Sequence, residues 1–235
     1  MRVLYWAGCT LRRRLPSVVE EHVELLSALG VEVVRLGREG CCGDVLYLAG
    51  LREEFAKNAS RVAEGLRGLG ADAVVTGCAG CYHAFKLYAE AGLDVPQVLH
   101  LAHVAADLMP TLSGGERVAY HDPCKLGRLS GVFEEPRRAI SKVASLVEPL
   151  TAGRGAACCG GGGLWLLEPE LSLAMAEVRL ARDVEPLRPA KLVTACPVCL
   201  LNLSIASSRR QGAAGAWVEV VDLGSYLLAR LRGGG

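Results

Sequence analysis

The sequence predicts an α/β protein made of two related halves, each a small parallel sheet flanked by helices. Short apolar segments alternate with segments of helical periodicity along the whole chain, which is typical of β-α-β crossovers. Ten cysteines form two sets of five in the same order, and corresponding cysteines lie 115 to 118 positions apart. The 235 residues, 51% of them hydrophobic, are enough for two domains.

In the first half, β-branched or apolar runs predict four strands, at residues 2–8, 31–36, 73–76 and 95–99. Helical periodicity predicts helices at 16–29, at 44–69, after Cys81 and up to about Met109. Pro16 suits the first turn of its helix and Gly30 its end, and Gly50 is expected to break the second helix.

The second half repeats this order. Strands are predicted at 118–120, 147–150, 192–194 and 217–221. Helices are predicted at 136–146, from 164 to about 184, at 200–210 and from the last strand to about 231. The run Ser113-Gly114-Gly115 is typical of a linker, which predicts one domain at 1–112 and a second at 116–235.

Each cysteine set consists of a lone cysteine, an adjacent pair followed by glycine, and a C-x-x-C motif. The first set is Cys9, Cys41, Cys42, Cys78 and Cys81, and the second is Cys124, Cys158, Cys159, Cys196 and Cys199. Each motif comes just after a predicted strand, and the carboxyl ends of parallel strands share one edge of a sheet. We therefore expect each set to converge as one metal site near the seam between the halves.

The motifs also suit the presentation of thiolates. Amide groups at a helix N-terminus favour the thiolate of a C-x-x-C motif. Gly43 and Gly160 allow the backbone turn that aims both sulfurs of an adjacent pair inward. Five sulfurs exceed the four ligands of a structural zinc or of an ordinary cubane cluster, so an unusual iron–sulfur cluster and zinc both stay open.

Composition narrows the classes of function. The net charge is +1, and no arginine-rich tract carries interleaved aromatics, which argues against nucleic-acid binding. No uninterrupted apolar run reaches the ~18 residues of a membrane span. No signal peptide is evident, so the cysteines indicate a reducing cytoplasm, with peripheral attachment to a membrane through partners as an alternative. The glycine run 160–163 lacks the ending of a phosphate-binding loop.

The spacing resembles the cysteine-rich CCG domain of the family named after the B subunit of heterodisulfide reductase, which also includes iron–sulfur subunits of lactate and glycolate oxidation systems. The resemblance spans each half once. It is carried by both cysteine sets and by the segments Tyr120-His121-Asp122-Pro123-Cys124, Cys158-Cys159-Gly160-Gly161-Gly162 and Cys196-Pro197-Val198-Cys199.

This resemblance implies two non-cubane [4Fe-4S] clusters, one held by each set of five cysteines, with zinc in one site as an alternative. It implies an oxidoreductase subunit that cleaves a small-molecule disulfide, or forms one from thiols, in one-electron steps. The second set would be the catalytic one. Electrons would come from an iron–sulfur electron-transfer subunit fed by a flavin-containing subunit. The alternatives are an electron-relay subunit of a lactate, glycolate or succinate oxidation system and a zinc-stabilised interaction module.

Several other residues are candidates for the site. His83 and His121 lie within three positions of a cysteine of the sets, and either could donate a hydrogen bond to a cluster sulfur or a proton to a product thiol. Arg13 and Arg128 each lie four residues after the first cysteine of their half, and Lys125 is close by. These cations predict an anion-binding rim for the substrate, or simply a solvated face. His100 and His103 are expected to cap a helix.

Overall fold

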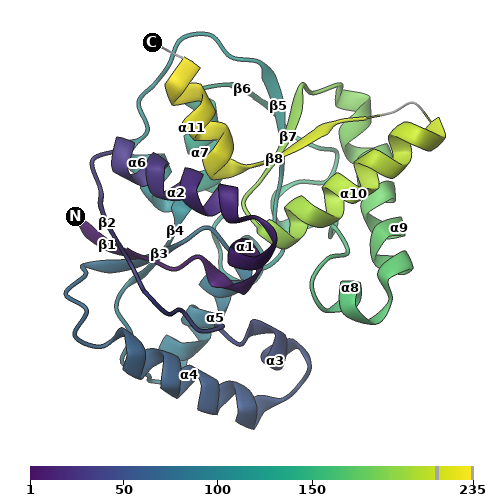
Figure 1. Ribbon diagram of the computed structural model, residues 1–235. Coiled ribbons are helices and arrows are strands. Elements are labelled where there is room, and N and C mark those ends of the chain that lie inside the picture. The colour runs from purple at the N-terminus through teal and green to yellow at the C-terminus, as the bar shows by residue number, and fades with distance from the viewer. Residues whose placement is uncertain (215–216, 234–235) are drawn as a thin grey trace.

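The computed structural model describes residues 1–214 and 217–233 (Figure 1). It has two four-stranded sheets, with strand orders β2-β1-β3-β4 and β6-β5-β7-β8, and all strands within each sheet are parallel. The second order is the first one repeated, with each strand moved on by four. The predicted α/β fold with two similar halves is therefore confirmed.

Short β-branched and apolar runs form the strands, as the residue pattern predicts. Their bounds are β1 (Arg2–Tyr5), β2 (Glu32–Arg35), β3 (Ala73–Thr76), β4 (Val98–His100), β5 (Arg117–His121), β6 (Ser145–Val147), β7 (Lys191–Thr194) and β8 (Glu219–Asp222). The central strand β3 is buried along its whole length, whereas the edge strand β2 is half-buried or exposed. Parallel sheets are covered on both faces, which explains the continuous apolar character of the central strands.

Helices lie between successive strands along the chain, as the connection of parallel strands requires. Their bounds are α1 (Gly8–Arg14), α2 (Pro16–Ala28), α3 (Asp44–Leu48), α4 (Arg52–Leu66), α5 (Ala79–Glu90), α6 (Leu101–Leu108), α7 (Glu134–Ser141), α8 (Gly163–Leu167), α9 (Pro169–Arg179), α10 (Pro197–Ala214) and α11 (Leu223–Gly233). Every helix in the described chain is too short or too polar to span a bilayer.

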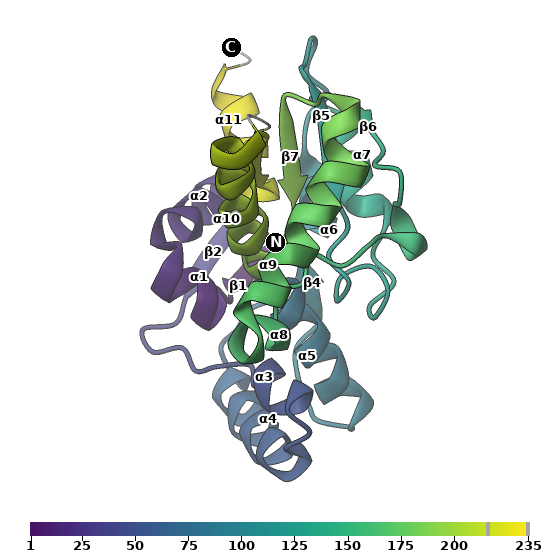
Figure 2. The same cartoon turned by 90° about the vertical axis from the view of Figure 1, so that its right-hand side faces the viewer.

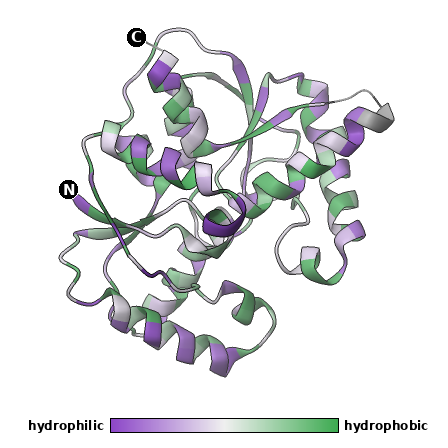
Figure 3. Ribbon diagram, in the orientation of Figure 1, coloured by the Kyte–Doolittle hydropathy of each residue, from purple (hydrophilic) through white to green (hydrophobic). Residues whose placement is uncertain are grey.

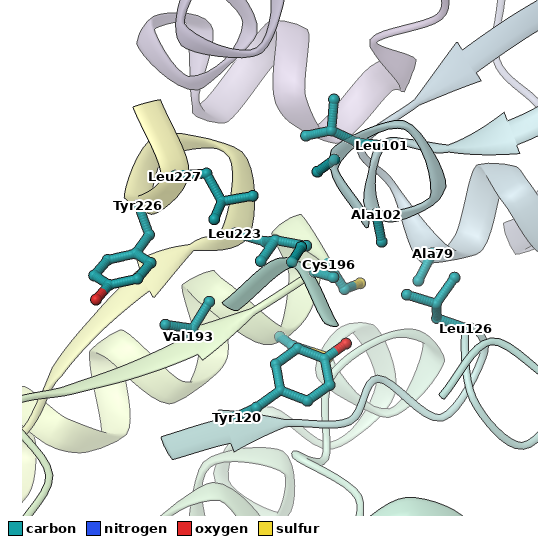
Figure 4. Packing of buried hydrophobic residues seen from close by; sticks show 14 of the residues in the cluster. Ala79, Leu101, Ala102, Tyr120, Leu126, Val193, Cys196, Leu223, Tyr226 and Leu227 are labelled. Atoms are coloured by element: carbon teal, nitrogen blue, oxygen red, sulfur yellow. The ribbon is translucent and has the colours of Figure 1, made fainter. Parts of the chain in front are cut away.

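The two halves share one continuous core. Helix α2 of the first half packs against α11 of the second, and α6 packs against α7; Figures 1 and 2 both show α2 beside α11. Figure 4 shows Ala79 and Ala102 of the first half close to Leu126 and Cys196 of the second. A smaller cluster packs α4 and α5 against the first sheet, and hydrophilic residues cover the outer side of α4 in Figure 3.

A buried histidine also ties the halves together. His22 on α2 is fully buried. The Tyr5 hydroxyl donates a hydrogen bond to its Nδ1 at 2.5 Å, and its Nε2–H donates one to Asp222 at 2.5 Å. Gly77 and Gly224 leave room for the ring, because a Cβ at either position would lie 2.2–2.4 Å from an atom of His22. The contact therefore joins the first sheet to the end of β8.

Some element predictions were wrong. The single helix expected from 164 to about 184 is interrupted at Glu168, directly before Pro169, and ends in a π-helical turn at Leu180–Val184. Proline lacks the amide donor and restricts the residue before it, which explains the break. The helix expected to reach residue 146 ends at Ser141 instead, so the following strand lies at 145–147 rather than 147–150.

Helix α1 was not predicted from the sequence. Other expectations are confirmed or stay predictions. The break at Gly50 is confirmed, since it separates α3 from α4 with a φ of +78°. His100 and His103 form the predicted cap of α6. The domain bounds 1–112 and 116–235 stay predictions, and residues 234 and 235 lie outside the described part.

Candidate metal centre

All ten cysteines line one cavity of about 420 Å³ between the two halves. The two cysteine sets therefore converge on the same space, one from each side of the seam. This arrangement follows from the fold, because every cysteine motif comes after the carboxyl end of a strand in its sheet.

In the first half, the cysteines lie in three loops and first turns. Cys9 is in the first turn of α1, the pair Cys41-Cys42 precedes α3, and Cys78 directly precedes α5, which contains Cys81. The Sγ atoms of Cys9 and Cys41 are 3.7 Å apart. The lone cysteine and the adjacent pair, 32 positions apart, therefore meet in space.

The second half repeats the arrangement with one difference. Cys124 lies in a turn after β5 rather than in a helix, Cys158 and Cys159 precede the glycine run, and Cys196 precedes α10. The Sγ atoms of Cys159 and Cys199 are 3.2 Å apart. The adjacent pair and the C-x-x-C motif therefore also meet in this half.

The thiols of neighbouring cysteines affect one another's pKa along a single chain of sulfurs, in which hydrogen bonds join Cys9 to Cys41 and Cys159 to Cys199. From end to end the chain runs Cys9, Cys41, Cys42, Cys81, Cys78, Cys196, Cys199, Cys159, Cys158, Cys124. From either end the order is the lone cysteine, the pair, then the C-x-x-C motif. Cys78 and Cys196, the first cysteines of the two C-x-x-C motifs, affect each other's pKa across the cavity that both line.

Neighbouring thiols lower the pKa of some of the cysteines and raise the pKa of others. Hydrogen bonds from Cys124 and Cys159 lower the pKa of Cys158 to about 2. Bonds from Cys41 and Cys81 likewise lower the pKa of Cys42. The pKa of Cys199 is raised by its hydrogen bonds to Cys159 and Cys196 and by burial. Metal binding requires thiolates, so a bound metal would displace the protons that these sulfurs share.

Glycines and side-chain hydrogen bonds shape the two loops that carry the adjacent pairs. Gly43 and Gly160 have φ angles of +76° and +79°, as expected of residues that turn the chain after each pair. In the first half, the Tyr88 hydroxyl donates to the Cys42 carbonyl at 2.5 Å. In the second half, Asn202 Nδ2 donates to the Cys159 carbonyl at 2.6 Å. Each loop is thus held from the helix that follows its C-x-x-C motif.

His121 lies directly beside the second cysteine set. One ring nitrogen of His121 and the Sγ atoms of Cys159 and Cys199 lie within 4.8 Å of one another. His121 is 1% exposed, and neither ring nitrogen has a hydrogen-bond partner among the described residues. The indole nitrogen of buried Trp6 in the first half also has no such partner. Clustered sulfurs beside unused N–H donors fit a group that has both metal ions and acceptor atoms.

His83 lies farther from the sulfurs. Its Nδ1 is 3.7 Å from an oxygen of Asp44, and the ring is 7% exposed. Asp44 lines the cavity and also forms an ion pair with Lys125 of the other half. Sequence reasoning missed Asp44, although its place directly after the first Cys-Cys-Gly motif was a usable signal.

The predicted basic rim is only partly present at the cavity. Arg13 and Lys125 line its wall. Arg128 is exposed and is not among the described residues that line the cavity. The reason is local, because Cys9 begins a helix that carries Arg13, whereas the chain after Cys124 forms a turn.

Comparison with known proteins identifies relatives of both halves. Residues 3–86 and 118–204 match the cysteine-rich domain called CCG. The chain is 34% identical over 220 residues to the D subunit of the dihydromethanophenazine:CoB–CoM heterodisulfide reductase of Methanosarcina acetivorans, covering 86% of this chain and 53% of the relative. It is 27% identical over 231 residues to an uncharacterized iron–sulfur protein of Methanocaldococcus jannaschii, covering 97% and 46%.

Two further proteins also resemble the chain. It is 29% identical over 219 residues to the EtfAB:quinone oxidoreductase of Syntrophomonas wolfei, covering 86% of this chain and 30% of that protein. A hypothetical protein from Helicobacter pylori shares the fold, with a TM-score of 0.71, 10% identity and coverage of 98% of this chain and 49% of the other. The chain spans about half the length, or less, of these three curated relatives. Both halves match one family, so the chain belongs to the cysteine-rich CCG domain family.

Proposed function

We propose that this chain is an iron–sulfur redox subunit that reduces a small-molecule disulfide, or oxidises the corresponding thiols, in one-electron steps at two non-cubane [4Fe-4S] clusters. The observation that carries this proposal is the convergence of all ten cysteines on one cavity. A relative named as part of a heterodisulfide reductase supports a disulfide substrate. When bound, such clusters supply single electrons and iron atoms that attract the sulfurs of the substrate.

The cysteines that would hold these clusters differ in their exposure to solvent. Cys42, Cys81, Cys159 and Cys199 are each at most 5% exposed. The lone cysteines Cys9 and Cys124, and the first cysteines of the pairs, are more open. The buried sulfurs would exclude water from one side of each centre, and the open sulfurs would leave the other side accessible to substrate.

Charged residues at the cavity would bind and orient the substrate. Arg13 and Lys125 line the wall and would attract a carboxylate or phosphate group. Asp44 holds Lys125 in place through its ion pair. His83, next to Asp44, would hold a proton at a ring nitrogen for a product thiolate, and His121 would donate an N–H to a sulfur of the second centre.

Electrons would come from a partner iron–sulfur subunit fed by a flavin-containing subunit. This chain has no C-x2-C-x2-C-x3-C-P run of its own, which is the pattern of ferredoxin-type clusters. The three curated relatives named above are about twice its length or longer, so the complete activity would need further domains or subunits.

Metal analysis of anaerobically purified protein tests this proposal. We expect about four irons and four sulfides per half, as in a [4Fe-4S] cluster. Oxidation in the presence of a thiol should then produce a new EPR signal. Zinc as the main metal in both halves would instead support the interaction module and contradict the redox proposal.

An electron-relay subunit is the second candidate. The relative named EtfAB:quinone oxidoreductase favours it, because that name contains a quinone and no disulfide. A loaded chain whose EPR spectrum does not respond to any thiol or disulfide, but which still exchanges electrons with a quinone-linked partner, would support the relay.

A further inference from the structure

Two buried side chains near the second cysteine set carry N–H groups that have no hydrogen-bond partner in the described part of the chain. Arg179 on α9 is 1% exposed, and its Nε and Nη2 have no hydrogen-bond partner among the described residues. Neither ring nitrogen of His121 has such a partner either, and one of the two carries an N–H. Leaving a buried donor unpaired costs about 1–3 kcal/mol, so these groups indicate an acceptor that the polypeptide itself does not provide.

Arg179 belongs to the surroundings of this cysteine set. It lines a second cavity, of about 380 Å³, together with Cys158. Its Nη1 donates to Thr151 at 2.5 Å and to Asp183, which holds the guanidinium in place. Burial is the main cause that lowers the pKa of His121 to about 4, and the charge of Arg179 is the second.

The first half has different residues at the matching positions. The strand Arg2-Val3-Leu4-Tyr5 corresponds to Arg117-Val118-Ala119-Tyr120, so Trp6 takes the place of His121. A Cβ built on Gly8 would lie 2.7 Å from Cys81 Sγ and 3.9 Å from Trp6 Nε1, so the indole nitrogen and that sulfur both face Gly8. The pairs Cys41-Cys42 and Cys158-Cys159 are 117 positions apart, and the residue 117 positions before Arg179 is the apolar Val62.

We infer that Arg179 and His121 give an iron–sulfur centre in the second cysteine set a higher reduction potential than a centre in the first set. This inference rests on the proposed function. Hydrogen bonds to sulfur and nearby positive charge stabilise the more negative, reduced state of such a centre. The first set is offered one neutral indole N–H, whereas the second is offered a guanidinium and an imidazole.

The difference gives electron transfer within the chain a direction. An electron delivered by an iron–sulfur partner to the first centre passes to the second, so that the first centre is oxidised by one electron and the second reduced by one. The second centre is then the one that accumulates reducing equivalents. Both sets line the same cavity of about 420 Å³, which places them next to each other for this transfer.

An EPR-monitored redox titration of the anaerobically purified, cluster-loaded chain tests the inference. Replacing Cys78 and Cys81 together by serine, or Cys196 and Cys199 together, assigns each signal to one half. We expect the signal of the second half to have the higher midpoint potential. Arg179→Gln and His121→Phe should each lower only this potential, by at least tenfold in the reduction equilibrium, which is about 59 mV for one electron.

Two controls keep the test specific. Arg182→Gln removes an exposed arginine from the wall of the same second cavity and should change neither potential. Trp6→Phe keeps an aromatic ring but removes the indole N–H, and should lower only the potential of the first half. If Arg179→Gln does not fold because Asp183 loses its partner, His121→Phe and the double variant Arg179→Met/Asp183→Leu provide the same measurement.

Several outcomes would overturn the inference. One is a loaded chain in which the two halves have equal midpoint potentials, or in which the first half has the higher one. Another is that Arg179→Gln and His121→Phe shift both midpoint potentials equally, or shift neither. These results leave the proposed function intact, because iron and sulfide are present. A chain that binds no iron would remove the proposed function, and the inference with it.

Discussion

The two halves of this protein hold their cysteines in the same order but in different surroundings. In the first half the neighbours are aromatic: Trp6 packs edge-on against Phe85 with ring centroids 5.2 Å apart, and the Tyr88 hydroxyl holds the loop of the first pair. In the second half they are polar, with His121 beside the sulfurs and Asn202 holding the loop. One arrangement of cysteines therefore has a chemically different environment in each half.

The largest expected effect separates the halves by metal content. Cys159→Ser removes a sulfur at the centre of the second set, and we expect the chain to lose about half of its iron while the first site stays loaded. Cys42→Ser is the matched variant of the first half and should have the mirror-image effect. Iron analysis with EPR measures both. Loss of all iron from either variant would mean that the two sets form one indivisible site.

A smaller effect is expected on stability from the glycine after each pair. A Cβ at Gly160 would lie 2.3 Å from the backbone oxygen of Ser172, whereas at Gly43 the closest atom, at 2.8 Å, is the side-chain Nδ2 of Asn58. In both variants the new alanine must adopt a left-handed backbone conformation, which lowers the free energy of unfolding by about 1–2 kcal/mol. For Gly160→Ala the free energy of unfolding should fall by a further ~1–3 kcal/mol because of overpacking, since the backbone oxygen of Ser172 cannot rotate away as a side chain can.

Urea unfolding of the two variants measures this difference. Equal losses of unfolding free energy would show that the loop of the second pair shifts as readily as that of the first.

His100 and Asp222 lie directly before α6 and α11, at equivalent places in the two halves. We expect their replacement to have the next largest effect on stability. His100 accepts one backbone N–H, from Ala102 at 3.1 Å. Asp222 accepts from Gly224 at 2.7 Å and Ser225 at 3.2 Å, and also from His22 at 2.5 Å. We expect Asp222→Ala to cost about 2–4 kcal/mol and His100→Ala about 1 kcal/mol.

Thermal and urea unfolding of both variants, with Asp222→Asn as the isosteric control, would check this order. If His100→Ala proved to be the more destabilising variant, the contact through His22 would not be what joins the halves.

The smallest expected effect concerns substrate binding. Arg13 lines the cavity and Arg128 does not, although both lie four residues after a lone cysteine. With an anionic disulfide, Arg13→Ala should raise KM about 2- to 5-fold, the range expected of an exposed charge pair. Arg128→Ala should leave KM unchanged, and a larger effect at Arg128 than at Arg13 would place the substrate elsewhere.

Most of the fold could be predicted from local patterns. Strand β3 was predicted at its observed bounds because Ala73–Thr76 is a short β-branched run between turn residues. The helices around Pro169 were not, because the helical periodicity continues through the proline and hides the break. Helix α1 was missed because its seven residues include three consecutive arginines and show too short an apolar pattern.

The amino-acid order alone was enough to predict two sets of cysteines as ligands and to place each set at the edge of a sheet, because strand ends are local features and parallel strands share an edge. Only the docking of the halves brings the ten sulfurs to one cavity and pairs Asp44 with Lys125. Docking also buries Cys196 against residues of the first half. Such contacts depend on how two separate cores pack, and no spacing along a chain contains that information.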